Sequence, residues 1–279
     1  MLLGYNTNGM SHHDLLDAVT LLAELGYRGV AITIDHGALS PRDRSFGEQL
    51  GPLRRLLQQL GMRSVIETGA RFLLDPREKH EPTLLSPDRF ARARRQEFYR
   101  HAIRCAAELE SDCVSLWSGA LREEVPYEEA LARLADGLGP VLEDAARHGV
   151  VIGFEPEPGM LIDSMARFDD LLRRIDSPAL RLTLDVGHLH CQGETPIPDV
   201  IRTWAPRLAN VHLEDMRAGV HEHLMFGQGE IDFPPVIRAL VDVGYQGGVF
   251  VELSCHSREA PSAARQAMEF LRAILDGIT

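Results

Sequence analysis

The chain has 279 residues and a formal net charge of −12 at pH 7, and aromatic residues make up only 6% of it. The excess of acidic residues argues against nucleic acid as a main partner, because nucleic-acid binding usually begins with a basic surface that releases counterions. No apolar run approaches the roughly 20 residues needed to cross a bilayer, and the first residues, Met-Leu-Leu-Gly-Tyr-Asn, lack the features of an export signal. We therefore predict a cytoplasmic protein without a membrane segment.

Cysteine and lysine usage argues against two further classes of protein. Four cysteines without CxxC spacing are typical of reduced thiols and not of a disulfide framework; they are Cys105, Cys113, Cys191 and Cys255. Lys79 is the only lysine, and it lies in the polar stretch Asp-Pro-Arg-Glu-Lys-His-Glu-Pro. Schiff-base aldolases and pyridoxal enzymes need a lysine amine, usually a desolvated one, so covalent lysine chemistry is not expected.

Short apolar runs alternate with longer segments of helical period along the whole chain, which predicts repeated βα units. Strands are expected at residues 2–6, 29–34, 63–67, 113–117, 150–155, 181–185, 208–212 and 248–252. The first helix is expected between a cap at Ser11 and an end at Gly26. Further helices are expected near 48–60, 87–109, 127–148, 164–175, 197–204, 233–243 and 261–277. Eight strands without the GxGxxG turn of many open doubly wound sheets favour an α/β fold of the (β/α)8 TIM-barrel type, with residues 1–279 as a single domain.

Two of the expected connections after strands are long. Residues 68–86 contain Arg71, Lys79 and His80, and residues 213–232 contain Arg217, His221 and His223. Loops that follow the strands of such a barrel build its active site, so these two segments are expected to be lid and specificity elements. A mobile surface insertion is the alternative for the first of them.

Four acidic or imidazole side chains each stand at the end of an expected strand. They are Glu155, Asp185, His212 and Glu252. The carboxyl ends of parallel barrel strands meet at one mouth, and carboxylates with one imidazole are suitable ligands for a divalent cation. The pattern therefore predicts a metal enzyme. A buried ion pair between Glu155 and an arginine such as Arg181 is the structural alternative.

Other residues near these strand ends are candidates for substrate contacts. Glu157 follows Glu155 by two residues in a proline-rich loop, and two acids beside a buried strand end need a compensating charge. Asp185-Val-Gly-His places His188 one short turn beyond Asp185, where both side chains could face the same cavity. Trp117 could form an apolar wall for a sugar ring or pack at the barrel rim. Asp35 and His36 could reach the site or cap the following loop, and Glu67 points at the mouth only if the third strand ends there.

The order Glu155, Asp185-x-x-His188, His212 and Glu252 resembles the xylose-isomerase-like TIM-barrel superfamily, and in particular its sugar and sugar-phosphate isomerases and epimerases. The resemblance implies that these four ligands hold one Mn²⁺, Co²⁺, Mg²⁺ or Zn²⁺ ion. It also implies that Glu155 and Glu252 act as paired acid and base, and that His188 and Arg217 contact the substrate. A small sugar-like substrate and a homo-oligomeric assembly are further expectations.

The sequence departs from the pattern of a single metal after His212. His221-Glu222-His223 resembles the loop that supplies an Asp-x-His pair to a further metal in the metal-dependent apurinic endonucleases of the superfamily, with a histidine in place of the aspartate. His188, His221 and His223 could therefore hold a second cation, and three imidazoles favour Zn²⁺ or a similar ion. Substrate contacts and a purely structural loop are the alternatives.

Three functions remain open from the sequence. The favoured one is a metal-dependent isomerase or epimerase acting on a polyhydroxy carbonyl compound through an enediolate, with free or phosphorylated sugars as substrates. The second is a metal-dependent lyase, dehydratase or hydrolase of the apurinic-endonuclease type. The positions where those endonucleases have histidines after the third and fourth strands contain no histidine here, which counts against it. The third is a barrel that binds a metabolite without catalysis.

Overall fold

Eight parallel strands close into a barrel in the computed structural model, which describes residues 1–43 and 46–278. Around the barrel the strands follow the order β1, β10, β7, β6, β5, β4, β3, β2. Their bounds are Leu2–Asn6 (β1), Gly29–Thr33 (β2), Arg63–Glu67 (β3), Val114–Leu116 (β4), Ile152–Phe154 (β5), Leu180–Asp185 (β6), Leu208–Leu213 (β7) and Gly248–Val251 (β10). The (β/α)8 barrel expected from the alternation of apolar runs and helical segments is confirmed, and all eight strands lie within two residues of their expected bounds.

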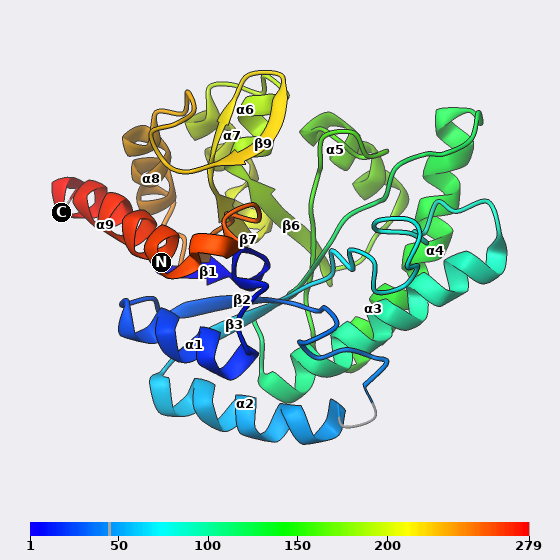
Figure 1. Cartoon of the computed structure of the whole chain (residues 1–279). Helices are drawn as coiled ribbons and strands as arrows, with labels where there is room; N and C mark the ends of the chain where they lie inside the picture. Colours follow the sequence, from blue (N-terminus) through cyan, green and yellow to red (C-terminus); the bar gives the residue numbers. More distant parts are fainter. Residues whose placement is uncertain (44–45, 279) are drawn as a thin grey trace.

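Helices surround the barrel on its outside (Figure 1). They are α1 (Leu15–Glu24), α2 (Phe46–Leu60), α3 (Arg89–Leu109), α4 (Tyr127–Arg147), α5 (Met165–Arg174), α6 (Val186–Cys191), α7 (Ile197–Trp204), α8 (Phe233–Asp242) and α9 (Ala260–Ile278). The expected cap at Ser11 is wrong: residues Thr7–Met10 form a 3-10 turn, and Asp14 caps α1 by accepting a hydrogen bond from the Leu16 amide. Asp satisfies an unpaired helix amide as well as Ser does, so residue type alone does not distinguish Asp14 from Ser11 as the cap. None of the described helices combines the length and the apolar character that a membrane crossing requires.

One end of the barrel interior is filled with apolar side chains. Ala31, Val65, Cys113 and Phe250 form a separate buried cluster inside the ring of strands. A Cβ atom at Gly4 would lie 2.2 Å from the Phe250 ring, so this strand position has to be glycine for the ring to fit. The polar side chains described below lie further along the strands, toward their carboxyl ends.

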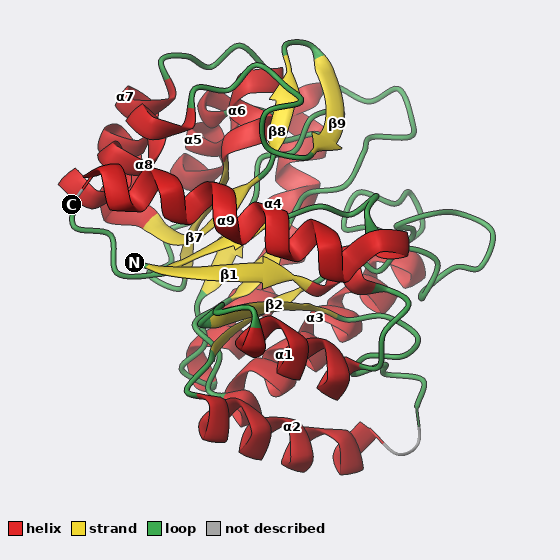
Figure 2. Ribbon diagram, turned by 60° about the vertical axis from the view of Figure 1, so that its left-hand side comes forward, coloured by secondary structure: helices red, strands yellow, loops and turns green. Residues whose placement is uncertain are grey.

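The segment after β7 forms a hairpin that was not predicted from the sequence. Residues Asp215–Arg217 (β8) and Val220–Leu224 (β9) form an antiparallel hairpin that stands apart from the barrel at one end of the molecule (Figure 2). His221 and His223 alternate with Glu222 along β9, so the two imidazoles leave the strand on the same face. The other long connection, 68–86, contains no helix or strand.

Candidate metal centre and cavity

The four expected ligands converge at the carboxyl ends of β5, β6, β7 and β10. One ligand atom from each of Glu155, Asp185, His212 and Glu252 lies within 4.8 Å of the other three. The amides of Glu155 and Glu252 donate to Leu116 and Leu213, which extends the parallel hydrogen-bond ladders one residue past the strand ends. Asp185 and His212 are register partners on neighbouring strands. The barrel ladder itself therefore fixes the backbone of all four residues.

His212 is the centre of the group, and its two ring nitrogens have different neighbours. Its Nε2 lies 3.0 Å from Oε1 of Glu67, whose side chain is also held by the Asn210 amide. Its Nδ1 lies 2.9 Å from Glu252, 3.1 Å from Glu155 and 3.8 Å from Asp185. A carboxylate on one ring nitrogen fixes the tautomer that presents the other nitrogen as a ligand. Burial alone lowers the pKa of His212, but Glu67, Glu155 and Glu252 together raise it well above its usual value.

The donor set fits a divalent cation. Oδ2 of Asp185 is buried and has no hydrogen-bond partner among the described residues, while Oδ1 accepts a bond from the His188 amide at the start of α6. A buried carboxylate oxygen without a donor is costly unless a cation or a proton compensates it. Three carboxylates and one imidazole around one point supply the oxygen-rich ligands that Mn²⁺ or Mg²⁺ takes, and Zn²⁺ and Co²⁺ also accept them. The alternative ion pair with Arg181 is wrong, because Arg181 is bonded to the Pro206 carbonyl.

The two glutamates of the group have opposite electrostatic environments. Burial raises the pKa of Glu155 to about 8 in spite of the nearby His212. The pKa of Glu252 is lowered below its usual value, because the opposing effect of burial is outweighed by His212, His223 and His188. Its Oε1 accepts a hydrogen bond of 2.7 Å from the Asn8 side chain. Pairs of carboxyl groups whose pKa values are pushed apart are typical of acid and base partners in one site.

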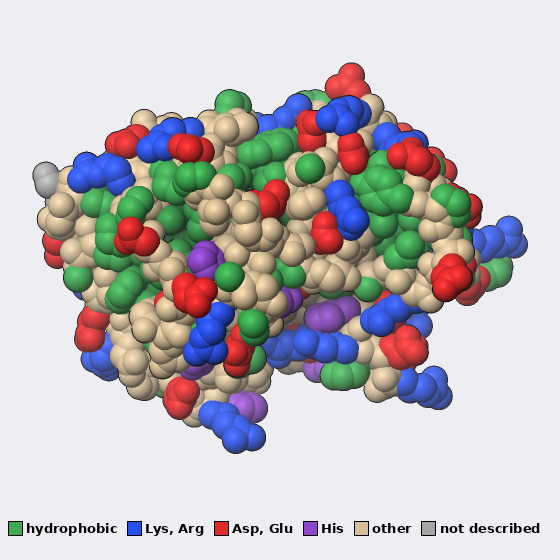
Figure 3. All heavy atoms as spheres, turned by 90° about the horizontal axis from the view of Figure 1, so that it is seen from above, with side chains coloured by type: hydrophobic (Ala, Val, Ile, Leu, Met, Phe, Trp, Pro, Cys, Tyr) green, Lys and Arg blue, Asp and Glu red, His purple; other side chains and the backbone are tan. Residues whose placement is uncertain are grey.

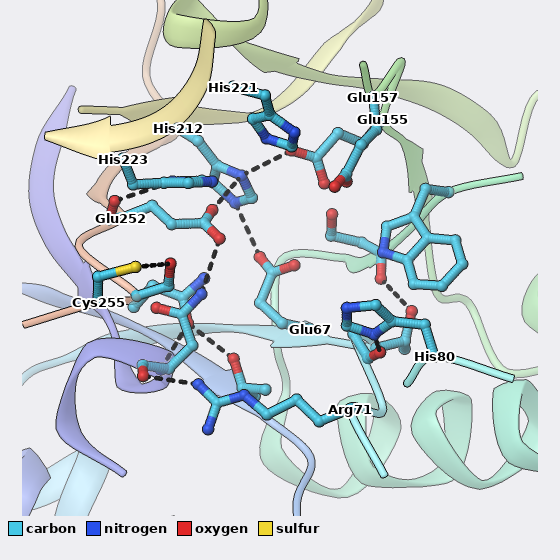
Figure 4. A pocket seen from close by; sticks show the side chains of 18 of the residues that line it. Glu67, Arg71, His80, Glu155, Glu157, His212, His221, His223, Glu252 and Cys255 are labelled. Carbon is cyan, nitrogen blue, oxygen red and sulfur yellow. Dashed lines mark hydrogen bonds and ion pairs between the residues drawn. The ribbon is translucent and has the colours of Figure 1, made fainter. Parts of the chain in front are cut away.

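A cavity of about 350 Å³ opens over this group, within the range of small-molecule sites. Figure 4 shows Glu155, Glu157, His221, His212, His223 and Glu252 toward one side of it and Arg71 and His80 toward the other. Trp117 and Glu157 line the cavity as expected for substrate contacts, and Lys79 lies at it as well. On one face of the molecule, histidine side chains lie beside lysine or arginine side chains at a hollow (Figure 3).

Arg217 does not reach this cavity. Its side chain is half exposed, donates to the Gln228 carbonyl and lies 3.8 Å from Glu222, and the residue is not among those that line the cavity. Asp35 and His36 line a neighbouring cavity, where Asp35 forms an ion pair with Arg71. His190 lies 3.4 Å from Glu230 and is not among the residues that line the cavity.

Two further buried residues adjoin the centre, and the sequence left the role of each open. Glu67 ends β3 and holds His212, a role that depends on the exact end of that strand. Glu214 is fully buried, both of its carboxyl oxygens lack a donor among the described residues, and burial together with Asp185 raises its pKa well above the usual value. The sequence alone does not show that Glu214 is buried beside Asp185.

Gly187 makes room for Glu214, which leads to a first prediction. A Cβ at Gly187 would lie 1.9 Å from Oε1 of Glu214. We expect Gly187→Ala to destabilise the protein by about 1–3 kcal/mol, because overpacking at a buried site forces side chains and backbone to shift. Urea unfolding measures the effect. Gly139→Ala in α4 is the matched control, since nothing lies within 4 Å of its Cβ position, and equal unfolding midpoints for the two variants would contradict this account.

His80 provides a second prediction, on the dependence of stability on pH. Burial, with Lys79, Arg95 and Arg71 nearby, lowers the pKa of His80 from 6.5 to about 4, although its bond to the Gly69 carbonyl opposes the shift. Because the folded pKa lies below the unfolded one, the stabilising contribution is complete above pH 6.5 and is lost as the pH falls toward 4. His80→Asn, which tolerates the positive φ of 70° at this position, should weaken that loss. Urea unfolding of both proteins across this range measures it, and parallel pH curves would disprove it.

Comparison with known proteins assigns the family. A family profile described as xylose isomerase-like TIM barrel matches residues 19–274. The chain belongs to this family. An L-ribulose-5-phosphate 3-epimerase, UlaE, from Shigella flexneri is 25% identical over 251 residues, which cover 89% of this chain and 85% of that protein. An uncharacterized protein, MJ1311, from Methanocaldococcus jannaschii is 28% identical over 184 residues, covering 64% and 62%.

Solved structures share the fold along the whole chain. A D-tagatose 3-epimerase-like protein superimposes with a TM-score of 0.81 at 23% identity and covers 100% of this chain and 98% of its own. An L-ribulose 3-epimerase has a TM-score of 0.80 at 20% identity, with 99% and 95% covered. The barrel and the surrounding helices are therefore common to proteins whose sequences differ at about four positions in five.

Proposed function

We propose that this xylose isomerase-like barrel is a divalent-metal-dependent epimerase or isomerase of a sugar or related polyhydroxy carbonyl compound. The observation that carries the proposal is the convergence of Glu155, Asp185, His212 and Glu252 on one point beneath a cavity. Relatives with assigned names include 3-epimerases of ribulose phosphate and of free ribulose. These names favour epimerisation over isomerisation or dehydration.

Glu155 and Glu252 are proposed as the proton-transferring pair. Both line the cavity, and they reach it from strands on different sides of His212. One carboxylate removes the proton from the carbon next to the substrate carbonyl, and the other carboxylic acid returns a proton to the opposite face of the same carbon. The configuration at that carbon is thereby inverted. Asn8 orients Glu252 through its side-chain amide, so Asn8 is a positioning residue.

Glu155, Asp185, His212 and Glu252 would hold the cation, with Glu67 fixing the tautomer of His212. When bound, a divalent cation polarises a carbonyl and stabilises the negative charge of an enediolate. Trp117 and Glu157 are proposed to contact the substrate from the wall of the cavity, the first through its ring and the second through hydrogen bonds to hydroxyl groups. His188, the other residue expected to contact the substrate, is buried beside Asp185 and Glu155, with its Nδ1 3.7 Å from Glu155, and is not among the residues that line the cavity.

A second cation is proposed at His188, His221 and His223, which form a group of ligand atoms within 4.8 Å of one another. The Nδ1–H of His188 donates to the Pro156 carbonyl and that of His223 to the Glu252 carbonyl, so in the neutral imidazoles Nε2 is the nitrogen available to a cation. The Nε2 atoms of His188 and His221 are 3.1 Å apart, close to the separation of about 3.3 Å between two nitrogens on a tetrahedral zinc ion. Backbone acceptors behind imidazoles are typical of metal ligands.

Metal stoichiometry tests the second cation. We expect the protein to retain two zinc ions per chain after dialysis, and His223→Ala to retain one. His190→Ala, which removes a histidine outside the cavity, should retain two. One ion in the unaltered protein, with the same number in His223→Ala, would assign His188, His221 and His223 to substrate contacts instead.

Proton exchange from deuterated solvent tests the proposed reaction. The protein is loaded with Mn²⁺ and incubated with a panel of ketoses and ketose phosphates. Deuterium should enter at the carbon next to the carbonyl, together with the appearance of the epimer. No exchange in any substrate would reject the proposal, with cleavage of an abasic oligonucleotide pointing to a hydrolase and binding without turnover pointing to a metabolite-binding barrel.

A further inference from the structure

We infer that the wall of the cavity formed by Arg71, Lys79 and His80, with Arg95 behind it, binds an anionic group of the substrate with the chemistry of a phosphate monoester. The inference rests on the proposed function, because it names the substrate class of the same cavity. Such a wall would favour a sugar that carries an acidic group over a neutral sugar. The four-ligand centre alone does not distinguish the two.

Arg95 supplies a buried positive charge without a counter-charge. The residue is 0% exposed, and its guanidinium donates to the carbonyls of Thr68 and His80. Its Nε is buried without a partner, and no carboxylate of the described residues lies within 4.0 Å of it. The guanidinium also stacks against the Trp117 ring at 4.6 Å, directly behind the cavity wall. A buried charge without a partner is expensive, and an anion in the cavity would compensate it.

Arg71 and Lys79 bring two further positive charges to the same wall. Both line the cavity, and no ion pair of Lys79 occurs among the described residues. Arg71 contacts Asp35 at 3.3 Å and donates to the Asn8 carbonyl at 2.7 Å, which leaves further N–H groups of its guanidinium for a ligand. Among the described residues, Asp35 is the only carboxylate that forms an ion pair with any of these three cations, so the wall carries a net positive charge. Phosphate oxygens are the acceptors that arginine forks and lysine ammonium groups bind best.

The backbone that carries these side chains adopts an unfavourable conformation. Ala70, Arg71 and His80 have φ angles of 59°, 39° and 70°, in the left-handed region that non-glycine residues seldom occupy. Hydrogen bonds from the Arg71 amide to Gly69 and from the His80 amide to Arg71 hold this conformation. Such strain is concentrated at ligand clamps, where it fixes side chains in position before the ligand arrives.

The charges of the cavity are separated between two sides. Glu155, Glu157 and Glu252 lie toward the side of the four-ligand centre, and Arg71 and His80 lie on the other (Figure 4). The carboxylates of the four-ligand centre would be compensated by the cation held there, whereas the basic wall has no bound ion, so an anionic group at that wall would orient the substrate with its carbonyl end at Glu155 and Glu252. A neutral ketose would gain no such orientation from these charges.

Binding and turnover of matched substrates test the inference. The probes are ribulose 5-phosphate and free ribulose, each as the D and the L form, with fructuronate as a carboxylate-bearing ketose. Calorimetry on the manganese-loaded protein gives Kd, and deuterium exchange gives KM. We expect the phosphorylated form of at least one enantiomer to bind at least about tenfold more tightly than its free sugar, the effect of one or two charge-assisted contacts.

Two variants distinguish a direct contact at the cavity wall from a general effect of the protein's charge. Lys79→Gln should reduce the preference for the phosphate by about fivefold to tenfold. Arg77→Gln removes a charge from the same segment, but Arg77 is exposed and does not line the cavity, so the preference should be retained. Lys79 is a cleaner choice than Arg71, which also contacts the backbone of Asn8 next to Glu252.

The outcomes distinguish this inference from the proposed function. Exchange into free ketoses with no preference for the phosphate, or a preference that Lys79→Gln leaves intact, would overturn the inference while the proposed function stands. Tight binding of the phosphorylated sugar without deuterium exchange in any probe would support the anion site but reject the proposed enzyme activity. A preference for fructuronate over the phosphate would assign the wall to a carboxylate and overturn the choice of a phosphate monoester. No binding and no exchange would overturn both.

Discussion

Replacing either Glu155 or Glu252 with glutamine should lower the rate of deuterium exchange by about 10²–10⁴-fold, the usual contribution of a positioned acid or base. The amide keeps the shape of the side chain but can neither accept nor supply the proton. Solvent exchange into a ketose, followed by mass spectrometry, measures the rate. Glu157→Gln is the contrast, because Glu157 lines the same cavity outside the four-ligand group and should change KM more than the rate at saturation.

Loss of activity in these variants could also come from loss of the cation, so manganese affinity has to be measured in parallel. The amide oxygen remains a ligand, and we expect each variant to bind manganese with at most a moderate loss of affinity. A variant that binds manganese but does not exchange supports the acid and base roles. Retained exchange in both variants would reject the assignment of Glu155 and Glu252.

Binding of the cation should also stabilise the fold strongly. Glu155, Asp185 and Glu252 surround Nδ1 of His212, and Oδ2 of Asp185 has no donor among the described residues. A cation present at 100 times its Kd stabilises the folded state by about 2.7 kcal/mol. For a domain of about this size, each kcal/mol corresponds to roughly 2–4 °C, so adding Mn²⁺ to chelated protein should raise Tm by about 5–10 °C.

Calorimetric unfolding of the chelated and the manganese-loaded protein measures this shift. Asp185→Asn is the informative variant, because it removes the charge of the ligand that lacks a donor and should abolish most of the shift. Asp199→Asn on the exposed side of α7 is its control and should retain the full shift. An unchanged Tm on adding manganese to the unaltered protein would count directly against a cation at this site.

The barrel could be predicted from sequence because its signals are local and repeated. Each strand is a short apolar run, and helices such as α3, α5 and α7 begin at a polar cap or a proline. One mistaken cap, at Ser11 instead of Asp14, therefore leaves the order of elements intact. The β8–β9 hairpin was missed because Val-His-Glu-His-Leu alternates polar and apolar residues weakly and lies within an otherwise polar loop. Pairing in such a segment depends on tertiary contacts.

The candidate centre was predictable to the extent that strand ends are predictable. Glu155, Asp185, His212 and Glu252 each follow an apolar run directly, and barrel closure brings such positions together. Glu67 also stands at the end of a strand and contacts His212. Its position at the mouth could be predicted only if the end of that strand was placed to the exact residue. Arg95, by contrast, lies in the middle of a polar helix, and nothing in the sequence distinguishes it from Arg92 or Arg94 before the structure buries it. Arg217 was carried over from the resemblance, and the hairpin geometry directs it outward.

We expect Glu155, Asp185, His212 and Glu252 to share one divalent cation. A crystal structure of the protein soaked in Mn²⁺, with diffraction data collected at the manganese absorption edge, tests this most directly. We expect an anomalous peak within about 2.0–2.3 Å of the three carboxylates and of Nδ1 of His212, the range of metal–oxygen and metal–nitrogen bonds. A fully soaked crystal with no anomalous peak between these four side chains would contradict it.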